Sequence, residues 1–206
     1  MKMTLLFCGG IPLAATVILW MIGRLDGEAE PGLQHIPAWL WILTAACGCL
    51  AGTGILCRIP DGAWGYRGTF AVGAVYLLVC GVTDFLTFQV YDFMQFAGVA
   101  AGVWSVLCQP IYPRLGVSLI LFALLQYVLF MRLYGQGDVM IFLVCALFET
   151  ARGGDIQTYL LHMAASCLLL GIVQLAKHNI GTTGNLKKSV PLVPYIAITA
   201  PVFWLG

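Results

Sequence analysis

The feature that most constrains this chain is a succession of apolar runs separated by short segments rich in glycine, proline and charge. Eight such runs can be traced, over residues 3–23, 37–57, 69–83, 93–109, 115–131, 139–148, 158–176 and 191–206. An apolar run of about 20 residues crosses the hydrocarbon core of a bilayer as an α-helix. Charged residues make up only 9% of the 206 residues, and the mean hydropathy is +0.93. The pattern predicts an all-α fold, a polytopic transmembrane helix bundle of about eight spans.

The predicted bundle divides into an N-terminal hairpin of two spans, residues 1–68, and a membrane core, residues 69–206. The first run follows Lys2 but lacks a small-x-small cleavage site and precedes further spans, so we predict a retained helix. A net charge of +1 gives no basic surface for nucleic acid. The eight cysteines form no C-x-x-C pair and the three histidines are scattered. We therefore predict no metal site and no cofactor.

Two acidic residues lie next to the two shortest runs. Asp84 directly follows residues 69–83, and Asp138 directly precedes residues 139–148. With alternating spans, both lie on the same side of the bilayer. The two runs give about 22 Å and about 15 Å of helix, against a hydrocarbon core of about 30 Å. Both helices must therefore recruit their flanks, which brings both carboxylates to the membrane surface or just below it, where an ionised carboxylate needs solvent or a partner.

Each acid by itself has a simpler interpretation, in which Asp138 caps the next helix and Asp84 is a solvated residue at a helix end. The glycines on either side of Gln136, Gly135 and Gly137, instead let the backbone bend sharply or let another backbone approach closely. That property suits a site that admits an extended peptide. Two carboxylates a few ångströms apart share one proton, so one can draw a proton from water while the other polarises a scissile carbonyl. The combination favours aspartic-protease chemistry.

Two segments resemble the type IV prepilin peptidase family of intramembrane aspartic proteases. The segment TDFLTFQVYDFMQFAGVAAG is similar to the family's first-aspartate segment, with Asp84 at the catalytic position and Asp92 at its Asn/Asp position. The segment GQGDVMIFLVCALF resembles the second, in which G-x-G-D precedes an apolar helix. Tyr91 replaces the usual Pro or Ser, and Met140 replaces the usual Lys. The segment KKSVPLVPYIAITA is similar to the start of the family's last span.

The resemblance implies a multi-pass aspartic endopeptidase of the bacterial cell (inner or plasma) membrane, with Asp84 and Asp138 catalytic. Gly135, Gly137 and Asp92 are expected to shape the site or contact the substrate. The implied substrates are prepilins or pseudopilins, whose leader peptide is removed at the cytoplasmic face. The segment between the first two spans is short and has no cysteine, so the zinc-binding insertion of bifunctional members is not expected. The lysine pair at 187 and 188 is expected on the same face as the acids.

Two alternatives remain open from the residues. The segment VYD, residues 90–92, together with GQGD also resembles presenilin and signal-peptide-peptidase enzymes, which would make Asp92 the first catalytic acid. We favour Asp84, because its surroundings align with the prepilin peptidase pattern and no Pro-Ala-Leu segment follows. In the other alternative the chain is a small transporter or channel component, in which Asp84 and Asp138 handle protons or a cation.

Two further groups of polar residues have structural predictions. Glu149, Arg152 and Asp155 of the segment ETARGGD are interpreted as a solvated loop. His162, in an apolar context, is interpreted as a packed or hydrogen-bonded residue inside the membrane.

Overall fold

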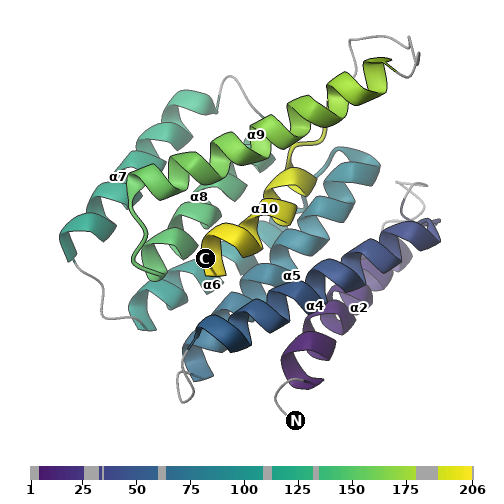
Figure 1. Cartoon of the computed structure of the whole chain (residues 1–206), viewed down its shortest axis with the longest axis horizontal. Coiled ribbons are helices and arrows are strands. Elements are labelled where there is room, and N and C mark those ends of the chain that lie inside the picture. The colour runs from purple at the N-terminus through teal and green to yellow at the C-terminus, as the bar shows by residue number, and fades with distance from the viewer. Residues whose placement is uncertain are drawn as a thin grey trace.

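The computed structural model describes residues 5–25, 33, 35–59, 64–108, 113–131, 135–179 and 190–205. Across these residues the chain forms a helical bundle without a β-strand (Figure 1). A π-helical turn, η1 (Leu5–Gly9), leads into eight α-helices: α2 (Gly10–Leu25), α4 (Ala38–Arg58), α5 (Trp64–Thr87), α6 (Asp92–Cys108), α7 (Pro113–Phe130), α8 (Gln136–Ala151), α9 (Ile156–Asn179) and α10 (Val193–Leu205). Each helix occupies one predicted apolar run, so the predicted all-α fold is confirmed.

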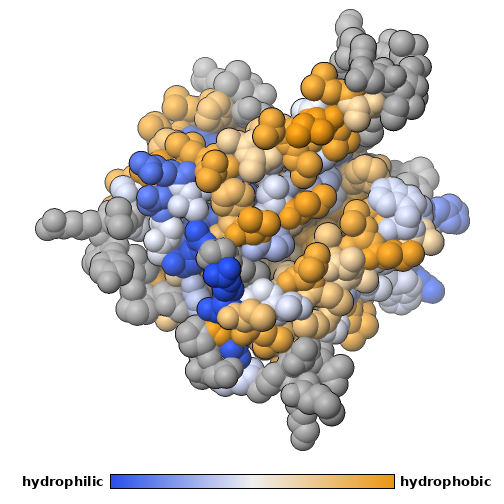
Figure 2. All heavy atoms as spheres, viewed as in Figure 1, coloured by the Kyte–Doolittle hydropathy of each residue, from blue (hydrophilic) through white to orange (hydrophobic). Residues whose placement is uncertain are grey.

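Within the described part of the chain, four helical segments are long and apolar enough to cross a membrane: Leu6–Leu25, Ala38–Arg58, Trp64–Thr87 and Ile156–Ala176. Shorter apolar helices cover Asp92–Cys108, Gly116–Phe130 and Val193–Trp204. Large apolar side chains are exposed along most of the helices, and Figure 2 shows them over much of one face, with a large group of hydrophilic residues at the left and a few at the right edge. Water would not tolerate an apolar surface of this extent. The chain is a membrane protein.

The helices that carry the two acids both extend beyond their apolar runs, as predicted. Helix α5 continues to Thr87, which places Asp84 in its last turn. Phe88 then adopts the left-handed conformation (φ 58°), and its amide donates to the carbonyl of Asp84. This conformation ends helices by turning the chain away from the axis. Helix α8 begins at Gln136, so Asp138 lies in its first turn.

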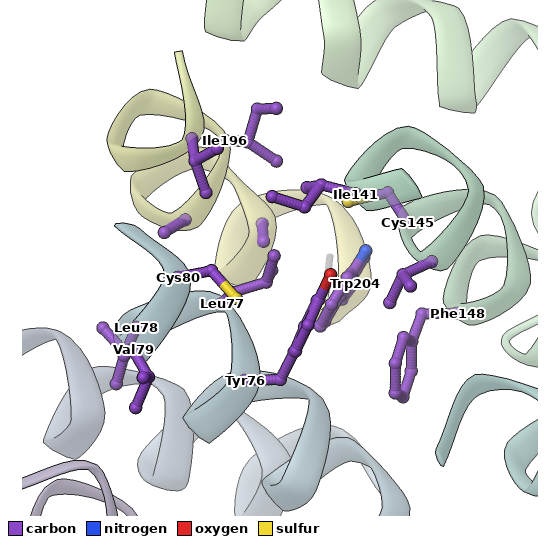
Figure 3. Close-up of a cluster of buried hydrophobic side chains, with 14 of the residues drawn as sticks. Tyr76, Leu77, Leu78, Val79, Cys80, Ile141, Cys145, Phe148, Ile196 and Trp204 are labelled. Carbon is purple, nitrogen blue, oxygen red and sulfur yellow. The ribbon is translucent and has the colours of Figure 1, made fainter. Parts of the chain in front are cut away.

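The core lies where α5, α8 and α10 meet, with side chains from all three pointing toward one another (Figure 3). Phe148 of α8 stacks on Trp204 of α10 at 4.5 Å between ring centroids, and its ring meets the edge of Phe70 of α5 at 5.2 Å. Tyr76 and Phe148 are almost completely buried. Aromatic pairs of this kind contribute about 0.5–1.5 kcal/mol beyond the area they bury. The cluster therefore fixes α5 relative to α8, and with it the ends of the helices that carry the acids.

Helix α4 lies against α2 and η1 with very little space between the backbones. A Cβ atom on Gly52 would lie 2.6 Å from the carbonyl oxygen of Phe7 and 2.7 Å from its carbonyl carbon. Because these are backbone atoms, they cannot move aside. We expect Gly52→Ala to lower the free energy of unfolding by about 1–3 kcal/mol, as overpacking does. In the control Gly171→Ala, the new methyl has no atom within 4 Å, so a change of zero or a gain of up to about 1 kcal/mol is expected. Denaturant titration in detergent measures both, and equal losses would contradict the prediction.

The turn between α8 and α9 differs from the predicted solvated loop. Helix α8 continues to Ala151, so Glu149 lies in its last turn and is completely buried. Its Oε2 accepts a hydrogen bond from Nε of Arg152 at 2.9 Å, and its Oε1 lies 3.6 Å from Nδ1 of His162 in α9. His162 is also completely buried and stacks on Phe203 of α10 at 4.9 Å. The loop prediction is wrong for Glu149, whereas the prediction that His162 is packed is confirmed.

Asp155 lies outside this cluster, at the start of α9. Its Oδ1 accepts hydrogen bonds from the backbone N–H of Thr158 at 2.8 Å and from the Thr158 hydroxyl at 2.9 Å. This is the arrangement of a side-chain N-cap. These hydrogen bonds favour the ionised carboxylate and hold the pKa of Asp155 below its usual value.

Candidate active site

The side chain of Asp84 is buried and held by a backbone donor. It is 6% exposed, and its Oδ2 accepts a hydrogen bond of 3.1 Å from the N–H of Val193, the first residue of α10. The first amides of a helix have no partner inside that helix and favour negative charge nearby. The start of α10 therefore serves as a fixed partner that orients the Asp84 carboxylate.

Asp138 lies inside the first turn of α8 and not at its N-cap position. The N-cap of α8 is Gly135, and the amide of Val139 donates to the Gly135 carbonyl at 3.3 Å. The simpler interpretation, in which Asp138 is the cap of α8, is wrong. Asp138 lies three residues into the helix and is partly exposed. Its carboxylate does not cap the N-terminus of α8 and is thus available for another role.

The predicted site residues line one cavity of about 350 Å³. Its walls come from the last turn of α5, the connection that follows it, and the first turns of α6 and α8. The lining residues are Asp84, Phe88, Gln89, Val90, Asp92, Gln95, Gly135, Gln136, Gly137 and Asp138. All five residues predicted for the site, two acids, two glycines and Asp92, are therefore brought together. A space of this size holds several water molecules or a short stretch of peptide, since a water molecule takes about 30 Å³ in the liquid.

Asp92 is the third acid in the cavity and differs from Asp84 in its surroundings. It is the first residue of α6 and is exposed. The first turn of α6 forms through the carbonyl of Tyr91, which accepts from the amides of Met94 and Gln95 at 3.0 and 3.2 Å. Acid–base residues usually need a carboxylate removed from bulk water and fixed by specific partners. Asp84 meets that description and Asp92 does not, which favours Asp84 as the first acid.

Two parts of the site were missed at the level of the sequence. Gln95 is 6% exposed and lines the cavity, although it lies inside the predicted apolar run 93–109. A polar residue within an apolar span is the signal that marks such a position. The amide of Val193 carries no sequence signal, because any residue has a backbone N–H. The predicted lysine pair, Lys187 and Lys188, lies outside the described residues.

The arrangement places two carboxylates on the wall of one cavity, where each can exchange protons with a molecule bound there. Over the part of the chain that the structure describes, no three His, Cys, Asp or Glu side chains group closely enough to hold a metal ion. General acid–base chemistry by Asp84 and Asp138 is what the side chains offer. A scan against models of known protein families finds no match for this chain, and comparisons with curated proteins and with solved structures find none either.

Proposed function

We propose that this protein is an intramembrane aspartic endopeptidase, with Asp84 and Asp138 as its catalytic pair. The observation that carries the proposal is that the two carboxylates, from helices distant in sequence, line one polar cavity. The buried, hydrogen-bonded state of Asp84 adds to it. Such pairs hydrolyse peptides without a metal or cofactor.

In the proposed reaction the pair begins with one shared proton. The ionised carboxylate takes a proton from a water molecule, whose oxygen attacks the carbonyl carbon of the scissile bond. The protonated carboxyl donates its proton to the carbonyl oxygen, which gives a neutral tetrahedral diol. On collapse the C–N bond breaks, one diol proton returns to a carboxylate and the amine nitrogen receives the other carboxyl's proton. The pair is then again singly protonated.

The position of the cavity favours a particular class of substrate. Asp84 lies in the last turn of α5 and Asp138 in the first turn of α8, so the acids are at one end of the helices and not at their middle. A substrate that fits has a polar leader followed by an apolar helix, with the cleaved bond where the two join. Together with the resemblance of the two aspartate segments, this favours prepilin-like or pseudopilin substrates, cut at the cytoplasmic face of a bacterial cell membrane.

The proposal is tested by co-expressing the chain with a prepilin reporter in a bacterium that lacks its own prepilin peptidase. We expect the leader to be removed, with the new N-terminus identified by mass spectrometry. In the prepilin peptidase family that the two segments resemble, the cut follows a glycine, so a reporter with a bulky residue in its place is the control and should stay intact. A reporter left whole by well-expressed protein would refute the proposal. Proton or cation flux in proteoliposomes that Asp84→Asn removes would instead favour the transporter alternative.

A further inference from the structure

Gln95 is a largely buried residue whose side chain lines the cavity of the two acids. It lies one turn into α6, is 6% exposed, and lines the same cavity as the two acids. Its backbone amide donates to Tyr91, but no described residue forms a hydrogen bond with its side chain. A primary amide has two donor hydrogens and an acceptor oxygen. No atom of the Gln95 side-chain amide is among the buried polar atoms that lack a partner, so water in the cavity can reach it, and a bound substrate group can replace that water.

The neighbours of Gln95 place it beside the G-x-G-D segment. Its Nε2 lies 3.6 Å from the position that a Cβ on Gly137 would occupy, and the Cβ of Val90 lies 3.3 Å from that same position. Gln95 and Val90 thus form the wall next to the residue that immediately precedes Asp138. By contrast, a Cβ on Gly135 would meet only the Oδ2 of Asp138, at 3.8 Å. The amide of Gln95 therefore lies close to the second acid. It borders the space that a side chain at position 137 would fill.

The chemistry of the cavity indicates what Gln95 can bind. The aspartates supply mainly acceptor oxygens, whereas an amide supplies a donor and an acceptor in one plane. That is the complement of a peptide group, whose N–H and C=O are arranged in the same way. Gln89 and Gln136 also line the cavity, but both are exposed to solvent. Of the three glutamines, Gln95 is the one that packing holds in place, so its amide is the one with a fixed position toward a bound backbone.

We propose that Gln95 binds the substrate backbone, pairing its side-chain amide with a peptide group next to the cleaved bond. This inference rests on the proposed protease function and adds a substrate-binding residue to it. The pairing holds the substrate extended across Gly137, with the cleaved carbonyl between Asp84 and Asp138. It recognises the main chain and not a side chain, so it acts on any sequence that reaches the cavity.

The test uses the full-length protein in nanodiscs and substrate peptides in which an ester replaces one peptide bond. Each ester removes one N–H at a bond flanking the cleaved one. We expect Gln95→Leu to lower kcat/KM about tenfold, the effect of losing about one good hydrogen bond. At one flanking position the ester should cost the wild type about tenfold and cost Gln95→Leu almost nothing, because the partner is already absent. At the other positions the ester should affect both proteins equally.

Three controls separate binding from folding. Gln95→Met, close to Gln in length, should repeat the result if Gln95→Leu is poorly produced. Gln157→Leu makes the same change at an exposed position near the start of α9 and should leave kcat/KM unchanged. The thermal midpoint of Gln95→Leu should not fall, because leucine buries no unpaired polar group. Equal ester penalties in both proteins at every position overturn the role of Gln95 alone, whereas absence of cleavage by the wild type overturns the protease function as well.

Discussion

Asp84→Asn and Asp138→Asn are each expected to lower the kcat/KM of leader removal by at least about 10³-fold. An amide cannot take a proton from water or donate one from a carboxyl group, and proton transfer by a positioned group contributes about 10²–10⁴-fold. Asparagine keeps the size of the side chain. Its oxygen at position 84 can still accept from the amide of Val193, which lies 3.1 Å from the carboxylate. The loss should therefore occur in a normally folded protein, measured by reporter cleavage at matched expression.

The matched control is Asp92→Asn, which removes the exposed third acid of the same cavity. We expect it to keep cleavage within about tenfold of the wild type, since Asp92 takes no part in the proposed proton transfers. The double variant Asp84→Asn with Asp138→Asn should be no slower than either single variant, because residues that act as a unit are not additive. Normal cleavage by Asp84→Asn and none by Asp92→Asn would transfer the first catalytic role to Asp92.

Glu149→Leu is expected to lower the free energy of unfolding by about 1–3 kcal/mol, because it removes the hydrogen bond from Arg152 and places an apolar side chain beside the buried His162. Glu149 is completely buried between Arg152 and His162. Its Oε2 would also lie 2.7 Å from a Cβ on Gly154, so the turn closes tightly over the carboxylate. Glu149→Gln keeps the shape and one acceptor for Arg152, and we expect about half that loss. Unfolding of the purified protein by denaturant in detergent measures both changes.

The control for this prediction is the double variant Glu149→Leu with His162→Leu. Replacing a whole buried ionisable pair with apolar residues is often close to neutral, so stability should recover partly relative to Glu149→Leu. Substrate cleavage should change little in any of these variants, because Glu149 and Asp138 lie at opposite ends of α8. Full stability of Glu149→Leu would show that the buried carboxylate contributes nothing to the fold.

The helices could be predicted because each depends on a local property of the sequence. The short runs beside Asp84 and Asp138 even predicted that α5 and α8 extend beyond their apolar residues, since helix length is set by the thickness of the bilayer. The two glycines and the acid of the GQGD segment lie in one cavity because they fall within four residues at the start of one helix. These parts of the site needed no knowledge of tertiary contacts.

The remaining parts could not be predicted because they depend on residues far apart in the chain. Glu149 looked solvated beside Gly153 and Gly154, yet packing of α9 places His162 over it. Gln95 looked like an isolated polar residue in an apolar run, and its position beside Gly137 follows from how α6 packs on α8. Hydrophobic periodicity identifies the buried face of a helix but not its neighbour.

The hydrogen bond from α10 to Asp84 has a consequence for biosynthesis. Translation proceeds from the N-terminus, so both acids enter the bilayer before the amide of Val193 has left the ribosome. Until α10 inserts, the Asp84 carboxylate lacks its fixed donor. For the proposed protease, we therefore expect hydrolysis only after the helix of residues 193–205 has docked against α5.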